Sequence, residues 1–123
     1  MANFCYLNVS PDKSKHRNDC VTRAISLASG LSYSKVRKKL YHTAQLLDCE
    51  KLCHKCYAHL IEKVLYAVPK NCDGMTVNDF ADIHPQGTYL LRMNGHITTL
   101  IDYCVFDLFD CREYFITNAW EVR

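Results

Sequence analysis

The stretch "TYLLRMNGHITTLIDYCVFDLFD", residues 88–110, decides the fold of this 123-residue chain. Its runs "TYLLRM", "HITTLI" and "CVFDLFD" are short and rich in Thr, Tyr, Ile, Val and Phe, residue types that favour strands. Asn94-Gly95 separates the first two runs, and this pair strongly indicates a two-residue hairpin turn. Together with "EYFITNAW", residues 113–120, the runs predict an antiparallel meander.

The register of the second hairpin determines which polar side chains meet. If Asp102 and Tyr103 form a two-residue loop, His96 lies diagonal to Asp107 on one face of the sheet, and such neighbours are ~7 to 8 Å apart. A three-residue loop would instead place Asp110 directly across from His96. Asp102 shares the face of His96 but lies roughly 20 Å along the strand. The tighter turn favours Asp107 and leaves Asp110 as the alternative.

Helical patterns precede these strands. "NDCVTRAISLASG", residues 18–30, repeats apolar side chains at helical spacing and ends at a glycine, which readily closes a helix. Ser32 or Ser34 can cap a second helix, and a third apolar stripe continues until Pro69 ends it. A capping box at Thr76 starts a short fourth helix. Helices followed by strands predict an α+β fold with the first helix packed on the sheet.

Composition limits the possible functions. The chain is 49% hydrophobic, which fits one compact domain over residues 1–123, and 15 basic against 13 acidic residues leave a net charge of +2. This charge favours neither nucleic acid nor membrane as a partner, and the basic cluster "SKVRKKL", residues 34–40, is typical of a solvated helix face. We find no secretory leader pattern and no apolar run near the ~18 residues of a membrane span. We therefore expect a cytoplasmic protein whose eight cysteines stay reduced.

Cys20 stands where a polar segment changes into the first helical pattern. A thiol in the first turn of a helix lies near unpaired N–H groups and the positive end of the helix dipole, which lower its pKa and can stabilise an oxyanion. A nucleophilic cysteine also needs a base, and His96 begins a central strand. The base needs an orienting group, which is Asp107 if the second hairpin has a two-residue loop and Asp110 if it has a three-residue loop. The alternative is that Cys20 is a buried thiol of the core.

The residues that carry these features resemble a known family. "NDCVTRAISLASGLSYSKV", then "HPQGTYLLRMNGHITTLID", "VFDLFD" and "AWEV", are similar to the small papain-like cysteine peptidase domains of bacteriophages and bacteria. The similarity spans most of the chain and is weakest between residues 45 and 75. It implies a papain-like fold in which the helix bearing the nucleophile packs on a C-terminal antiparallel sheet.

The resemblance also implies roles for individual residues. Cys20 would be the nucleophile, His96 the base, Asp107 the orienting residue, and Asn18 a support for the oxyanion. Tyr103 stands where the family pattern usually has glycine, and Ser14 stands where papain has its glutamine. The implied protein is a hydrolase of peptide, isopeptide or amide bonds that needs no cofactor, in the host cytoplasm if a phage encodes it. The alternative is a catalytically idle papain-like fold that binds a host protein.

A second cluster could bind zinc. Cys49, Cys53, Cys56 and His59 supply four soft ligands within eleven residues, and His54 and Cys72 are nearby. Tetrahedral zinc sites usually pair their ligands across a turn, whereas Cys53 and Cys56 fall in the apolar stripe of a predicted helix. The pattern therefore favours core cysteines over a metal site.

Overall fold

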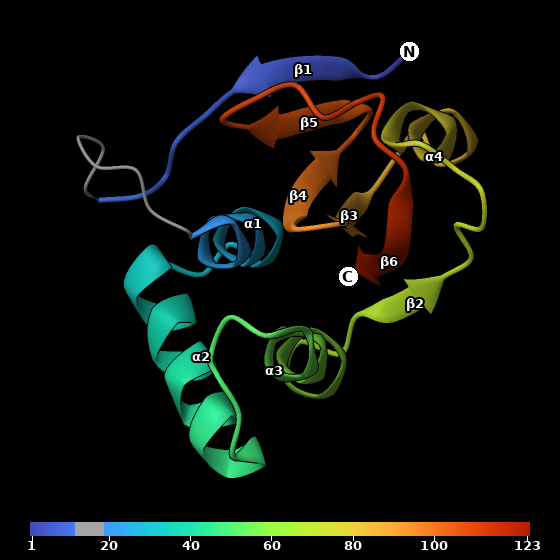
Figure 1. The fold of residues 1–123 in the computed structure, drawn as a ribbon. Coiled ribbons are helices and arrows are strands. Elements are labelled where there is room, and N and C mark those ends of the chain that lie inside the picture. The colour runs from blue at the N-terminus through green and yellow to red at the C-terminus, as the bar shows by residue number, and fades with distance from the viewer. Residues whose placement is uncertain (12–18) are drawn as a thin grey trace.

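A computed structural model describes residues 1–11 and 19–123 of the chain. It is an α+β structure, in which several helices pack against one six-stranded sheet (Figure 1). The helical elements are α1 (Cys20–Ser29), α2 (Tyr33–Leu47), α3 (His54–His59), the π-helix η1 (Leu60–Val64) and α4 (Val77–Ile83). The strands are β1 (Asn3–Tyr6), β2 (Val68–Lys70), β3 (Thr88–Met93), β4 (His96–Ile101), β5 (Cys104–Asp107) and β6 (Ile116–Val122).

Three of the predicted helices form with the expected ends. Gly30 closes α1 at a φ of 76°, the left-handed conformation that glycine adopts without strain. Ser32, rather than Ser34, caps α2 by accepting a bond from the Lys35 N–H at 3.2 Å. The capping box at Thr76 precedes α4 as predicted.

The prediction of one long third helix up to Pro69 is wrong. The helix starts at His54, widens into η1, and closes with a bond from the Leu65 N–H to the Leu60 carbonyl at 3.0 Å. Tyr66 then turns the chain at a φ of 57°, and β2 follows with Pro69 paired to Trp120. Proline is tolerated there because β2 is an edge strand, the position to which proline is largely confined within sheets.

Both predicted hairpins form with two-residue turns. Met93 pairs with His96 across Asn94-Gly95, and Ile101 pairs with Cys104 across the second turn. Asp102 and Tyr103 in that turn have φ values of 46° and 69°, as a type I′ turn requires at both central positions. The predicted register of β4 against β5 is therefore confirmed, at a backbone strain that the tyrosine carries in place of a glycine.

The predicted meander is wrong in its order. The strands run β1-β5-β4-β3-β6-β2, so β6 pairs with β3 instead of β5. The free edge of β5 is covered by β1, which runs parallel to it and which the sequence did not predict. Covering this edge protects its backbone groups from pairing with another chain. The last two predicted strands are also shifted, since β5 ends at Asp107 and β6 begins at Ile116.

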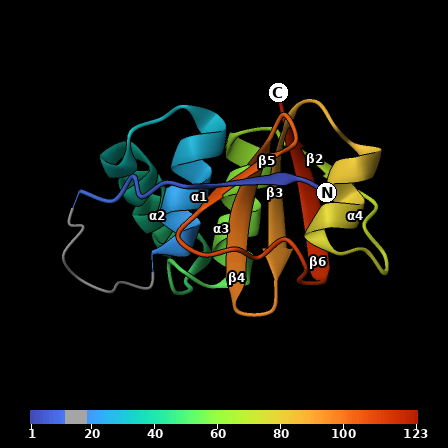
Figure 2. The ribbon, with the colours of Figure 1, turned by 90° about the horizontal axis from the view of Figure 1, so that it is seen from above.

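The sheet separates two hydrophobic cores. Figures 1 and 2 show α1, α2 and α3 on one side of the sheet and α4 on the other. Leu90, Ile97 and Trp120 face the first group of helices, and Leu91 and Leu100 face α4. This alternation along the strands is the period of two that a sheet covered on both faces requires. The first helix therefore packs on the sheet as the sequence predicts, and Cys20 is brought to the end of the sheet where β4 begins.

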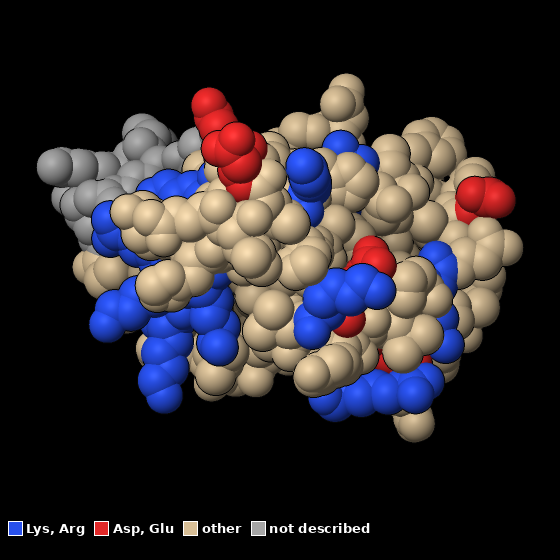
Figure 3. Space-filling view, turned by 90° about the horizontal axis from the view of Figure 1, so that it is seen from below, with Lys and Arg blue, Asp and Glu red and all other residues tan. Residues whose placement is uncertain are grey.

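The basic cluster of α2 faces solvent, as its spacing predicts. Lys35, Arg37 and Lys38 are exposed, whereas Val36 and Leu40 are buried in the core. Figure 3 shows basic side chains gathered on this helical side of the molecule. Within the described residues, every helix is too short or too polar to cross a bilayer.

Candidate active site

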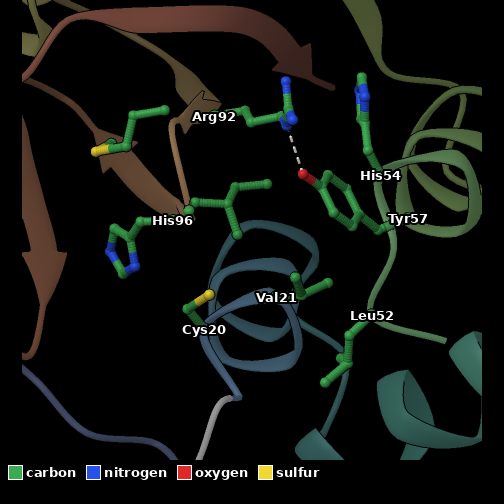
Figure 4. A pocket seen from close by; sticks show the side chains of 10 residues that line it. Cys20, Val21, Leu52, His54, Tyr57, Arg92 and His96 are labelled. Carbon is green, nitrogen blue, oxygen red and sulfur yellow. Dashed lines mark hydrogen bonds between the residues drawn. The ribbon is translucent and has the colours of Figure 1, made fainter. Parts of the chain in front are cut away.

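Cys20 and His96 meet at one end of a pocket between α1 and the β3–β4 hairpin. Helix α1 is fixed against β4 by a bond from the Thr99 hydroxyl to the Ala24 carbonyl at 2.8 Å. The first residue of α1 therefore lies beside the first residue of β4, where the Cys20 thiol and the His96 imidazole are close enough to shift each other's pKa. Figure 4 shows both side chains at the same end of this pocket. Two residues separated by most of the chain are thus brought together by one helix-to-strand contact.

Asp107 contacts the His96 imidazole. Its Oδ2 lies 2.6 Å from Nε2 of His96, and its side chain is only 2% exposed. The other carboxylate oxygen accepts the backbone N–H of Leu108 at 2.7 Å and faces Nη1 of Arg23 at 3.4 Å. With Nε2 directed to Asp107, the Nδ1 atom of His96 is left for the Cys20 thiol. The diagonal neighbour that the sequence predicts for His96 is therefore the one that it meets.

Asp110, the alternative partner, is not near the imidazole. Its carboxylate pairs with Arg112 at 2.7 Å and lies on the exposed surface beyond the end of β5. The two-residue turn excludes the register that would bring it to His96. The ring facing His96 is instead that of Phe109, with its centroid 4.6 Å away.

The three side chains change one another's pKa. Burial raises the pKa of the Cys20 thiol, but the hydrogen bond and charge of His96 outweigh it, so that this pKa is lowered. Burial lowers the pKa of His96, but its bonds to Asp107, Cys111 and Cys20 outweigh this penalty and raise the pKa to about 11. Burial likewise raises the pKa of Asp107, and its bond to His96 reverses this effect. These directions favour a thiolate, an imidazolium and a carboxylate side by side.

Two residues that the sequence analysis did not single out complete the surroundings of Asp107. Arg23 lies one turn after Cys20 and joins two buried carboxylates, with Nε 2.7 Å from Asp19 and Nη1 3.4 Å from Asp107. The Cys111 thiol donates to Oδ2 of Asp107 at 3.8 Å. The i,i+4 spacing of Asp19 and Arg23 is a signal that could have indicated the first pair, because helical neighbours of opposite charge meet.

The donor atoms of His96, Asp107 and Cys111 could together hold a metal ion. They lie within 4.8 Å of one another, and the described part of the chain contains no other such group of three. Imidazole, carboxylate and thiolate are ligands that suit zinc. An ion there would compete with the bond between His96 and Asp107.

In the second cluster the thiols of Cys49, Cys53 and Cys56 lie close enough to interact with one another, but the described residues form no group of three metal ligands there. Cys56 is fully buried and its thiol donates to the Leu40 carbonyl at 3.5 Å, and burial raises its pKa to about 11. Cys49 and Cys53 pack against the same core, and Cys72 lies in the core on the other side of the sheet. The core interpretation is therefore confirmed for Cys56. His59 ends α3 near this core.

Asn18, the expected support for an oxyanion, lies outside the described residues. The N-terminus of α1 still provides backbone N–H groups next to the thiol, which is the kind of donor that stabilises a developing negative charge. The role of Asn18 stays a prediction.

The chain was compared with known protein families, with curated proteins and with solved structures, and none of the three comparisons found a match.

Proposed function

We propose that this chain is a small papain-like cysteine hydrolase that cleaves a peptide, isopeptide or amide bond with a Cys20–His96–Asp107 triad. The observation that supports the proposal most is the position of the His96 ring, between the thiol of Cys20 and the buried carboxylate of Asp107. A nucleophile, a base and an orienting group in this order are what thiol-dependent acyl transfer requires.

The proposed reaction has two stages. The Cys20 thiolate attacks the carbonyl carbon of the substrate, and the imidazolium of His96 gives its proton to the departing amine as the carbon–nitrogen bond breaks. A thioester is left on Cys20 and neutral His96 then takes a proton from water. The resulting hydroxide attacks the thioester, the carbon–sulfur bond breaks, and the substrate leaves as a carboxylic acid.

Asp107 has two tasks in this scheme. Its bond to Nε2 fixes the ring so that Nδ1 faces Cys20, and its charge stabilises the imidazolium that forms before attack. Arg23 and the Leu108 N–H hold the carboxylate in turn. The orienting group is therefore itself positioned from α1 and from the residue that follows β5.

The partner in this proposal is a peptide or protein substrate, and no cofactor takes part in the reaction. All eight cysteines are free thiols, which suits a reducing compartment such as a bacterial or phage-infected cytoplasm.

Selective alkylation tests the proposal within the native chain. At pH 6 an ordinary thiol is mostly protonated, so a Cys20 thiolate should react with iodoacetamide on the order of a hundredfold faster than the exposed thiol of Cys5, which serves as an internal reference. Peptide mapping by mass spectrometry measures both rates in one sample. Equal rates would leave a papain-like binding module without catalysis as the better interpretation.

A library of peptide and acyl-type activity probes then identifies the bond that is cleaved. Labelling by such a probe should require Cys20 and be lost in Cys20→Ala.

A further inference from the structure

The pocket beside Cys20 has a second polar end. It encloses about 250 Å³, enough for a side chain or a short piece of peptide, and Cys20 and His96 line one end of it. Arg92, Tyr57 and His54 line the other end, from β3 and α3 (Figure 4). A substrate bound to the thiol would therefore extend toward these three side chains.

Within the described residues, Arg92 is held in place by neutral groups alone. Its Nε donates to the Tyr57 hydroxyl at 2.7 Å, and its Nη1 donates to Thr117 and Asn118 at 3.1 and 3.0 Å. Among residues 1–11 and 19–123, no carboxylate lies within ion-pair distance of its guanidinium, and its Nη2 donates to no side chain or carbonyl. By contrast, Arg23 bridges two carboxylates. The half-buried charge of Arg92 is thus fixed in direction, and the part of the chain that the structure describes supplies no counter-ion for it.

Two further groups face the same space. The Tyr57 hydroxyl accepts from Arg92, and its own proton has no acceptor in the described part of the chain. The His54 ring lies against Tyr57, with centroids 5.4 Å apart, and burial together with the charge of Arg92 lowers the pKa of His54. The charge of Glu62 raises the pKa of His54, and the Glu62 carboxylate accepts a hydrogen bond from the Trp120 N–H at 2.8 Å. The pocket therefore offers N–H and O–H donors around one uncompensated positive charge.

Such a set of groups matches a carboxylate. A planar guanidinium with free N–H groups binds carboxylates by charge-assisted bonds, and a neighbouring phenol adds a third donor. A neutral or basic ligand group would leave the charge of Arg92 uncompensated, which is unfavourable in a half-buried site.

We infer that this end of the pocket is a carboxylate subsite, and that the substrate carries a carboxylate next to the bond that Cys20 attacks. The carboxylate is either that of an Asp or Glu side chain or that of a chain terminus. The identification of the subsite with a substrate position rests on the function proposed above, whereas carboxylate binding by Arg92 does not.

Binding to the full-length Cys20→Ala variant tests the inference without turnover. Three probes are titrated while amide resonances of the pocket are followed by NMR: N-acetyl-glutamate amide, N-acetyl-glycyl-glycine and N-acetyl-glutamine amide. We expect one of the first two to bind about tenfold more tightly than the neutral glutamine probe, as a hydrogen bond to a charged group would give. Preference for the first identifies an acidic side chain as the ligand, and preference for the second identifies a terminal carboxylate.

Variants locate the effect. Arg92→Gln should abolish the preference, and Arg92→Lys, which keeps the charge, should retain part of it and shows that the pocket still folds. Arg123→Gln, which removes an equal charge from an exposed arginine, should leave the preference intact. Equal binding of all three probes, or an unchanged preference in Arg92→Gln, would overturn the inference.

These outcomes separate the two proposals. If Cys20 alkylates no faster than Cys5 while the carboxylate preference depends on Arg92, the proposed function fails and the binding site stands. If Cys20 is selectively reactive but the preference is absent, the function stands and the subsite is wrong.

Discussion

Replacing Asp107 by asparagine should lower the pKa of His96 by about four units. The carboxylate oxygen lies 2.6 Å from the imidazole nitrogen, and at an effective dielectric constant of about 20 two unit charges at this distance attract by ~6 kcal/mol. One pKa unit corresponds to ~1.4 kcal/mol, so loss of the charge removes about four units from a pKa of about 11. The burial that disfavours the imidazolium remains. The new amide can also donate to Nε2, which favours the neutral ring.

The measurement is an NMR titration of the His96 ring protons in the wild type, Asp107→Asn and Asp110→Asn. Asp110 pairs with Arg112 on the surface, so its variant serves as the matched control and should titrate like the wild type. Circular dichroism checks that both variants fold.

The same substitution should slow turnover about a hundredfold to a thousandfold on the substrate that probe profiling identifies. The loss should be smaller than the ~10⁴ known for the serine triad, because a thiolate–imidazolium pair is charged before attack and depends less on the third residue. A His96 pKa that stays near 11 in Asp107→Asn would refute the electrostatic reasoning, and full activity in both asparagine variants would leave a catalytic dyad.

Three further outcomes follow from the same geometry. Cys20→Ala should abolish probe hydrolysis and leave the melting temperature nearly unchanged, since little volume is removed; comparable turnover would contradict a nucleophilic role. The alkylation rate of Cys20 should increase with pH around a thiol pKa below the ordinary 9.0, because the thiolate forms above its pKa, and His96→Ala should shift this increase to higher pH. An unchanged pH profile in His96→Ala would mean that the two side chains do not interact. Arg23→Met should lower the free energy of unfolding, measured in urea, by about 3 to 5 kcal/mol, because two buried carboxylates lose their cation. If this free energy does not change measurably, the bonds from Tyr33 and His96 are enough to stabilise the two carboxylates.

A fifth prediction concerns the backbone alone. Tyr66 has a φ of 57° and is 78% exposed. Tyr66→Gly should raise the free energy of unfolding by about 1 kcal/mol, because glycine adopts the left-handed conformation without strain. The gain is smaller than the full strain because glycine also makes the unfolded chain more flexible. Urea denaturation measures the change, and a decrease would mean that the tyrosine ring contributes packing that outweighs the strain.

The parts of the fold that depend on local rules could be predicted from the sequence. Asn94-Gly95 and the two-residue turn at Asp102 fix the registers of their hairpins through backbone geometry. The register of β4 against β5 is sufficient to place His96 and Asp107 on the same face of the sheet. The ends of α1 and α4 follow from a glycine and a capping box, which act within a few residues.

The remaining features depend on contacts between distant segments. The pairing of β1 with β5 and of β6 with β3 leaves no signature in the strands themselves, because either neighbour would satisfy the same alternating pattern. Arg92 belongs to a predicted strand, but its meeting with Tyr57 requires α3 to stop where it does and η1 to follow. The polar end of the pocket could therefore not be predicted from the sequence, because it depends on how α3 packs against β3.

The tight turn between β4 and β5 provides a rule for recognising distant relatives. His96 and Asp107 are eleven positions apart, and lengthening or shortening both arms of the hairpin changes this interval by two each time. A relative that keeps a two-residue turn must therefore keep an odd interval, because an even one directs the acid to the opposite face. The parity of a spacing is retained when residue identities have diverged. Searches for a helix-borne cysteine followed by histidine and aspartate at odd separation could thus find relatives that overall similarity misses.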